Sequence, residues 1–96
     1  MYAIIWSPIA KTSYIEILKF LEENWTSKEI EYFISRTERL VKLISQNPNL
    51  FQYSINSDTF RCLVVPHVSL FYRLKNENIE LLVFWDNRKD PKKLII

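Results

Sequence analysis

Apolar residues recur at three- and four-residue steps through the first half of the chain, a period typical of amphipathic helices. A first helix is predicted to begin with Ser7 as N-cap and Pro8 at its first position. Thr26 and Glu29 form a capping-box pattern, so a second helix begins there and runs to about Gln46. The short link between the helices predicts an antiparallel hairpin. The apolar stripe of the first helix is Tyr14, Ile17, Leu18, Leu21 and Trp25.

The second half changes to alternating or short continuous apolar runs, which predict strands. They cover residues 51–55, 60–65, 68–74 and 79–85, and residues 2–6 form a further strand before the helices. Their short links favour an antiparallel meander. The order predicts an α+β fold: an N-terminal strand, an antiparallel helix hairpin, then an antiparallel meander sheet with the helices packed on one face. We expect residues 1–96 to form a single domain.

Side-chain alternation divides the predicted sheet into two faces. The face under the helices would hold Cys62, Val64, Leu70, Tyr72, Leu74, Leu81, Val83 and Trp85. The other face would hold Arg61, Ser69, Phe71, Arg73, Glu80, Leu82, Phe84 and Asp86, with Arg88 near its rim. Because this second set mixes aromatic and charged residues, it resembles a binding surface more than a solvated exterior.

Composition narrows the classes of protein to consider. Glycine is absent, so we expect turns with positive φ to fall on asparagines such as Asn56, Asn76 or Asn78. Cys62 is the only cysteine, which excludes a disulfide framework and indicates a reducing compartment. No signal peptide or membrane span is apparent, so a soluble cytoplasmic protein is expected. The net charge of +2 gives only weak support for a nucleic-acid partner.

Several motifs in a fixed order resemble the RelE/ParE superfamily of type II toxin-antitoxin toxins. They are W-S-P-x-A at 6–10, Trp25 with Phe33, an Asn-Pro after the second helix, Arg61, L-F-Y-R at 70–73 and D-N-R-K-D-P at 86–91. The resemblance spans essentially the whole chain. It implies a small bacterial toxin, of the kind linked to plasmid stabilization, that a cognate antitoxin silences by direct contact in a toxin-antitoxin hetero-oligomer.

Two activities occur in this superfamily. RelE-like members enter the ribosome and cleave mRNA as metal-independent endoribonucleases, whereas ParE-like members poison DNA gyrase; neither needs a cofactor. Arg61 and Arg88 match basic positions of the RelE-like site. Ser69 stands where RelE-like toxins carry an arginine, and residues 92–94 replace their C-terminal tyrosine or histidine. The resemblance therefore supplies two of the expected catalytic groups and lacks two.

Other side chains are candidates to complete a catalytic site. His67 is a candidate acid or base, although it also fits a plain turn residue. Asp86 would act as base, or would orient Arg61 or Arg88 by pairing with one of them. Arg73 would bind a phosphate, or would pair with Glu80 across a hairpin. The lysines that follow the last strand, Lys89, Lys92 and Lys93, are candidates for binding RNA or another target.

Three functions therefore stay open at this point. The chain is predicted to inhibit translation by ribosome-dependent mRNA cleavage through Arg61 and Arg88, with His67 or Asp86 assisting. Alternatively it inhibits gyrase without catalysis, or it is a decayed module that only binds antitoxin. All three share an antitoxin contact surface predicted at Phe71, Leu82, Phe84, Arg61 and Arg88.

Overall fold

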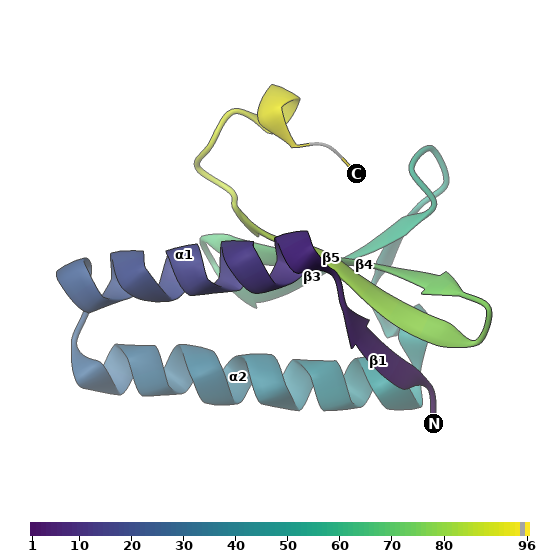
Figure 1. Cartoon of the computed structure of the whole chain (residues 1–96), viewed down its shortest axis with the longest axis horizontal. Coiled ribbons are helices and arrows are strands. Elements are labelled where there is room, and N and C mark those ends of the chain that lie inside the picture. The colour runs from purple at the N-terminus through teal and green to yellow at the C-terminus, as the bar shows by residue number, and fades with distance from the viewer. Residues whose placement is uncertain (95) are drawn as a thin grey trace.

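The computed structural model describes residues 1–94 and 96, and its elements follow the order expected from the sequence (Figure 1). The helices are α1 (Pro8–Asn24) and α2 (Ser27–Gln46), with short 3-10 turns η1 (Pro48–Leu50) and η2 (Pro91–Lys93). The strands are β1 (Ala3–Trp6), β2 (Gln52–Ser54), β3 (Thr59–Val65), β4 (Val68–Lys75) and β5 (Asn78–Asp86). The α+β prediction is confirmed, and α1 and α2 lie antiparallel beside each other.

The five strands form one mixed sheet in the order β1-β5-β4-β3-β2. Strands β2 to β5 pair antiparallel with one another in chain order, so the meander prediction is confirmed. Strand β1 pairs parallel with β5, with Ala3 opposite Asn78 and Trp6 opposite Leu81. The helix hairpin is thus the crossover that joins the two parallel strands, and it packs on one face of the sheet.

Both helices begin at the caps that the sequence indicated. The Ser7 hydroxyl accepts a hydrogen bond from the Ala10 amide at 3.0 Å. Thr26 and Glu29 form a complete capping box at the start of α2. Asn47 follows the end of α2 in an extended conformation, which lets Pro48 start η1. No helix in the described part of the chain is both long and apolar enough to cross a membrane.

The predicted alternation of β5 is wrong at its C-terminal end, because the strand contains a β-bulge. Phe71 pairs with Val83 but Tyr72 pairs with Leu81, which leaves Leu82 as the extra residue. Every side chain after the bulge therefore points to the opposite face from the one predicted. Phe84 and Asp86 lie on the helix side, whereas Val83 and Trp85 lie on the face turned away from the helices, here called the open face.

Helix α1 supplies partners for the backbone around this bulge. The Ser7 amide donates to the Leu81 carbonyl at 3.1 Å, and the Ser7 hydroxyl donates to the Leu82 carbonyl at 3.0 Å. The Phe84 amide donates to the Ser13 hydroxyl at 2.9 Å. Backbone groups that lose a partner at the bulge are thus satisfied by two serines of the first helix and its cap.

The core lies between the helices and the sheet. Phe84 is 2% exposed and its ring lies 4.9 Å from that of Tyr14 and 5.4 Å from that of Trp6. Cys62 is fully buried, as predicted, and burial raises the pKa of its thiol to about 11. Tyr72 is also fully buried, and its hydroxyl donates to the Pro48 carbonyl at 2.8 Å, which confirms its prediction as a core residue.

The hairpin turns lack glycine and place other residues at positive φ. Asn76 has a φ of 52° as predicted, but Asp58 and Glu77 take the remaining such positions in place of Asn56 and Asn78. Asn76 and Glu77 are consecutive between β4 and β5, and positive φ at both is the geometry of a type I′ turn. This turn fits the twist of the paired strands, which favours the β4–β5 register.

The Ser13 hydroxyl is expected to stabilise the fold through the bulge. Replacing it in Ser13→Ala leaves the Phe84 amide without a partner, which costs about 1–3 kcal/mol; better helix propensity offsets about 0.5 kcal/mol of that cost. Urea unfolding measures the difference. Ser35→Ala is the matched control, since the Ser35 hydroxyl donates to the Glu31 carbonyl of its own helix on the exposed side of α2. Equal stability of the two variants would contradict this role of Ser13.

Candidate functional site

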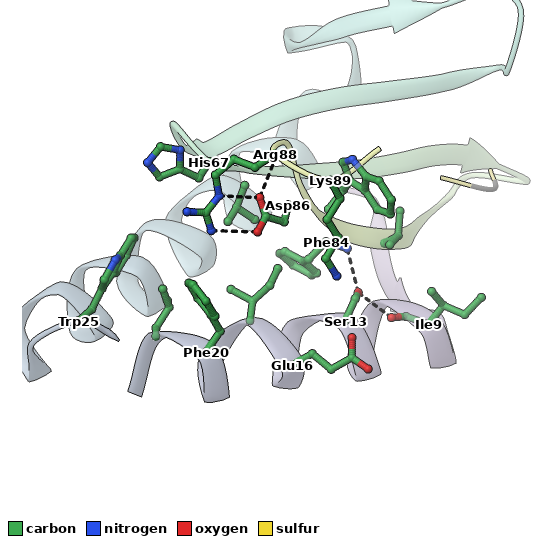
Figure 2. A pocket seen from close by; sticks show the side chains of 15 residues that line it. Ile9, Ser13, Glu16, Phe20, Trp25, His67, Phe84, Asp86, Arg88 and Lys89 are labelled. Carbon is green, nitrogen blue, oxygen red and sulfur yellow. Dashed lines mark hydrogen bonds and ion pairs between the residues drawn. The ribbon is translucent and has the colours of Figure 1, made fainter. Parts of the chain in front are cut away.

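A pocket lies between α1 and the C-terminal end of β5, and we call it the α1 pocket (Figure 2). Its volume is about 280 Å³. One wall comes from α1 and the facing wall from β5 and the residues around its end. The lining residues are Ile9, Ser13, Glu16, Ile17, Phe20, Leu21, Trp25, His67, Val68, Val83, Phe84, Trp85, Asp86, Arg88 and Lys89. The pocket is mainly apolar, and Asp86 and Arg88 lie at its end near His67.

An ion pair between Asp86 and Arg88 forms that charged end. The Arg88 Nε and Nη2 atoms donate to the two Asp86 carboxylate oxygens at 3.0 and 2.9 Å, and the Arg88 amide donates to the same carboxylate at 2.9 Å. These hydrogen bonds hold the pKa of Asp86 below its usual range and raise the pKa of Arg88. The Arg88 guanidinium also lies 5.4 Å from the ring centroid of Phe20. Arg88 therefore links the end of β5 to α1.

A second polar cluster lies on the open face, and it consists of Arg61, Ser69 and Asn87. Arg61 Nε donates to Ser69 Oγ at 2.9 Å, and Arg61 Nη2 donates to Asn87 Oδ1 at 3.0 Å. Ser69 Oγ donates to the same Asn87 oxygen at 2.9 Å. The Arg61 guanidinium lies 5.7 Å from the ring centroid of Phe71, its cross-strand neighbour. We call this group the Arg61 cluster.

Three consecutive residues divide between these two sites. Asp86 and Arg88 line the α1 pocket, whereas Asn87 belongs to the Arg61 cluster. The structure therefore does not bring the predicted catalytic arginines Arg61 and Arg88 together in one site. His67 lines the α1 pocket, and its carbonyl accepts a hydrogen bond from the Asn87 amide at 2.8 Å.

Asp86 has the geometry of an orienting residue. Its two oxygens are occupied by Arg88, and its lowered pKa keeps it ionised and weakly basic near neutral pH. Of the two partners considered from the sequence, the structure shows Arg88 and leaves Arg61 with Ser69 and Asn87. These contacts favour the orienting interpretation of Asp86 over the interpretation as a base.

The other predicted target-binding residues are placed separately. Arg73 lies opposite Glu80 in the sheet register, but its guanidinium donates to the carbonyls of Ser57 and Asp58 at 3.2 and 3.3 Å. It therefore fastens the turn between β2 and β3. Lys89 lines the α1 pocket, while Lys92 and Lys93 are exposed in η2.

The predicted antitoxin surface on the sheet requires correction. Phe84 was expected on the open face, but the bulge turns it to the helix side, where it is 2% exposed beneath α1 and lines the α1 pocket. Phe71 is also buried, at 9% exposure, and Leu82 is half-buried at the bulge. The exposed apolar side chains lie instead on α1, where Ile9 is 63% and Phe20 is 42% exposed.

Sequence reasoning missed Asn87, which binds Arg61 and Ser69. Alternation alone places it on the face opposite Asp86, so the signal was present, and only the bulge hid which face that was. Phe20 was also missed, because it falls outside the predicted apolar stripe of the first helix. Among the described residues, no group of three or more His, Cys, Asp or Glu side chains is arranged to hold a metal ion.

Comparison with known proteins gives one family and several similar structures. Residues 4–91 match the family described as the ParE toxin of the type II toxin-antitoxin system, parDE. No curated protein sequence matches. A copper-bound mutant toxin from Helicobacter pylori is 15% identical with a TM-score of 0.65, over 92% of this chain and 97% of that chain.

Structures of YoeB from Staphylococcus aureus are similar as well. In the YoeB-YefM complex the matching chain is 18% identical with a TM-score of 0.56, over 88% of this chain and 94% of that one. The YoeB dimer is 19% identical with a TM-score of 0.56, over 85% and 92% of the two chains. Likeness at these identities shows a shared fold.

The ion pair gives the stability of the protein a predictable dependence on pH. Because the pKa of Asp86 is lowered on folding, its contribution is present above the unfolded-state pKa and is lost as the pH falls through the folded-state pKa. Asp86→Asn should therefore lower the urea midpoint slightly near neutral pH and leave it unchanged at strongly acidic pH. Glu23→Gln, an exposed α1 carboxylate, is the control. A difference that persists in strong acid would show that Asp86 stabilises the fold by another route.

Proposed function

Because the chain belongs to the ParE toxin family of type II toxin-antitoxin systems, we propose that it is a toxin that inhibits its target by binding rather than by cleaving RNA. The family match over residues 4–91 confirms the resemblance that the sequence motifs indicated. The fold is common to toxins of both activities, so the mechanism has to be argued from individual side chains.

The separation of Arg61 from the candidate acid-base residues supports this proposal. Cleavage of RNA through its own 2′-hydroxyl needs a proton acceptor, a proton donor and cations around one phosphate. In the described part of the chain, the side-chain hydrogen-bond partners of Arg61 are a serine and an asparagine, which do not exchange protons readily near neutral pH. His67 and Asp86 line the α1 pocket on the helix side.

The open face is suited to contact with a protein target. Arg61 is exposed there, and Leu63 beside it is 54% exposed. Arginine is one of the residue types enriched in protein interfaces, and the apolar Leu63 side chain beside Arg61 adds surface that association would remove from water. DNA gyrase is the target that likeness to ParE toxins implies, and we propose that the open face around Arg61 contacts it.

Ribosome-dependent mRNA cleavage is the second candidate. One observation favours it: Arg61 occupies the position of a basic residue in RelE-like toxins and is fixed by hydrogen bonds. A fixed cation of this kind would stabilise the charge that develops on a phosphate. The proposal of target binding and this alternative differ in the first cellular process that the protein stops.

Expression from a tightly repressed promoter in a bacterium, with pulse-labelling of DNA and protein synthesis in one culture, tests the proposal. We expect DNA synthesis to stop before translation, and Arg61→Ala to relieve the arrest because it removes the exposed cation. Purified protein should also inhibit DNA supercoiling by gyrase.

Arg39→Ala is the matched control, since Arg39 is exposed on α2, away from the open face. It should retain the arrest. If translation stops first and mRNA is cut, the cleavage mechanism replaces the binding mechanism.

We also propose that the cognate antitoxin inserts an apolar segment with acidic residues into the α1 pocket. Ile9 and Phe20 expose apolar surface at its opening, which association would remove from water. Lys89 also lines the pocket and adds a cation beside the Asp86–Arg88 ion pair, which suits an acidic side chain of the partner. This placement replaces the surface that the sequence predicted on the sheet.

Phe20→Asp should weaken antitoxin binding about 10- to 100-fold. It removes an aromatic contact and places a negative charge in the pocket, which repels an acidic partner. Isothermal titration calorimetry measures the affinity for the antitoxin, taken as the small acidic protein encoded by the neighbouring gene. Tyr32→Asp is the control, since Tyr32 is an aromatic residue 60% exposed on α2. Equal losses in both variants would show that binding is not centred on the α1 pocket.

A further inference from the structure

We propose that Ser69 and Asn87 are positioning residues, which fix the Arg61 guanidinium so that its outer edge can bind a carboxylate of the target protein. The inference rests on the proposed function in one respect, the contact of Arg61 with a target. Beyond that contact, it assigns a role to two uncharged side chains, Ser69 and Asn87, and a specific orientation to the Arg61 guanidinium.

The Arg61 cluster is a closed ring of three hydrogen bonds. Arg61 donates to both partners, and Ser69 donates to Asn87 Oδ1, which closes the ring. Ser69 is fully buried, so water does not compete for the hydrogen bonds of its hydroxyl. The Asn87 backbone is held in turn by the His67 carbonyl at 2.8 Å. Each member is thus fixed by more than one contact.

This ring determines which donors of Arg61 point away from Ser69 and Asn87. A guanidinium carries five N–H groups in one plane. The ring uses the Nε–H and one Nη2–H, which together form one edge of that plane. The second Nη2–H and one Nη1–H lie outside the ring and together form the outer edge, which matches a carboxylate or phosphate in a bidentate contact.

The Phe71 ring and the neighbouring strand limit the remaining motion of the arginine. Its guanidinium lies 5.7 Å from the Phe71 centroid, within the range of a cation–π contact. An exposed arginine normally loses rotamer freedom when it binds a partner, which weakens binding. Arg61 has lost much of this freedom before a partner arrives, so the cluster pre-organises the contact.

The surroundings favour a protein carboxylate over a nucleic-acid phosphate. Leu63, exposed beside the cluster, pairs with Ser69 across the strands and gives the site an apolar border. Lys89, by contrast, lines the α1 pocket on the helix side. A nucleic-acid surface uses several cations along a backbone, whereas one oriented arginine beside apolar groups suits an acidic residue in a protein interface.

Two measurements test the positioning. Nitrogen-15 NMR of the arginine side chains reports whether rotation of the Arg61 guanidinium is restricted, and growth arrest in culture reports function. Ser69→Ala and Asn87→Ala should each release the restriction and lower the potency of growth arrest about tenfold, equivalent to about 1.4 kcal/mol. Asn49→Ala, at an exposed asparagine in η1, should change neither.

Asn87→Asp separates positioning from charge. The aspartate retains the oxygen acceptor, so Arg61 should stay restricted, but its negative charge competes for the guanidinium and should lower potency. Spectra of the folded variants exclude loss of structure as the cause. Restricted rotation of Arg61 in Asn87→Ala, or full growth arrest despite released rotation, would overturn the proposal.

The oxyanion is identified by titration of the Arg61 Nε–H signal. A short polyglutamate peptide should shift the wild-type signal and have less effect on Asn87→Ala. A shift with oligothymidylate alone would overturn the carboxylate assignment in favour of phosphate. If the wild type fails to arrest growth, the proposed function fails, while the NMR measurement still decides whether Ser69 and Asn87 position Arg61.

Discussion

The β-bulge at Leu82 determines which side chains of β5 face the helices and which face away. A strand of nine residues with a regular alternation would place Phe84 and Asp86 on the open face. The extra residue reverses this arrangement, and Ser7 and Ser13 of the α1 region bind the backbone groups around it. Packing of α1 and the position of the bulge therefore depend on each other. The helix packs on Phe84, which the bulge turns toward it, and the serine hydroxyls bind the backbone groups of the bulge.

The segment that follows the bulge explains why mixed charge ends an otherwise apolar strand. Asp86 and Arg88 face α1, where they pair with each other and Arg88 lies over Phe20. Asn87 between them faces the other way and joins Arg61 and Ser69. Exposed ion pairs contribute little to stability, so the value of this arrangement lies in geometry. Three consecutive residues fix one arginine on each side of the sheet, and the two arginines have separate surroundings.

The sequence predicted most of the fold because its signals are local. Caps such as Ser7 and Thr26 define the helix starts, and changes of period define the strands within a few residues. Tyr72 was assigned to the core correctly because the extra residue lies in β5, so the alternation along its own strand β4 is uninterrupted. The bulge itself has no comparable local signal, since Leu82 fits an apolar strand in either register. Its cause is tertiary, in the hydroxyls of a helix some seventy residues earlier along the chain.

The bulge also changes the predicted geometry of the candidate site. Likeness of sequence placed Arg61 and Arg88 at positions that act together in RelE-like toxins, but a matched position in sequence is a matched position in space only if the strands between keep their register. Here Arg88 is bound by Asp86 on the helix side, whereas Arg61 is fixed by uncharged partners on the open face. Among the described residues, the side-chain hydrogen-bond partners of Arg61 include no acid or base, and such a cation can recognise an anionic group without transforming it. Recognition is therefore the activity to which the chemistry around Arg61 is best suited.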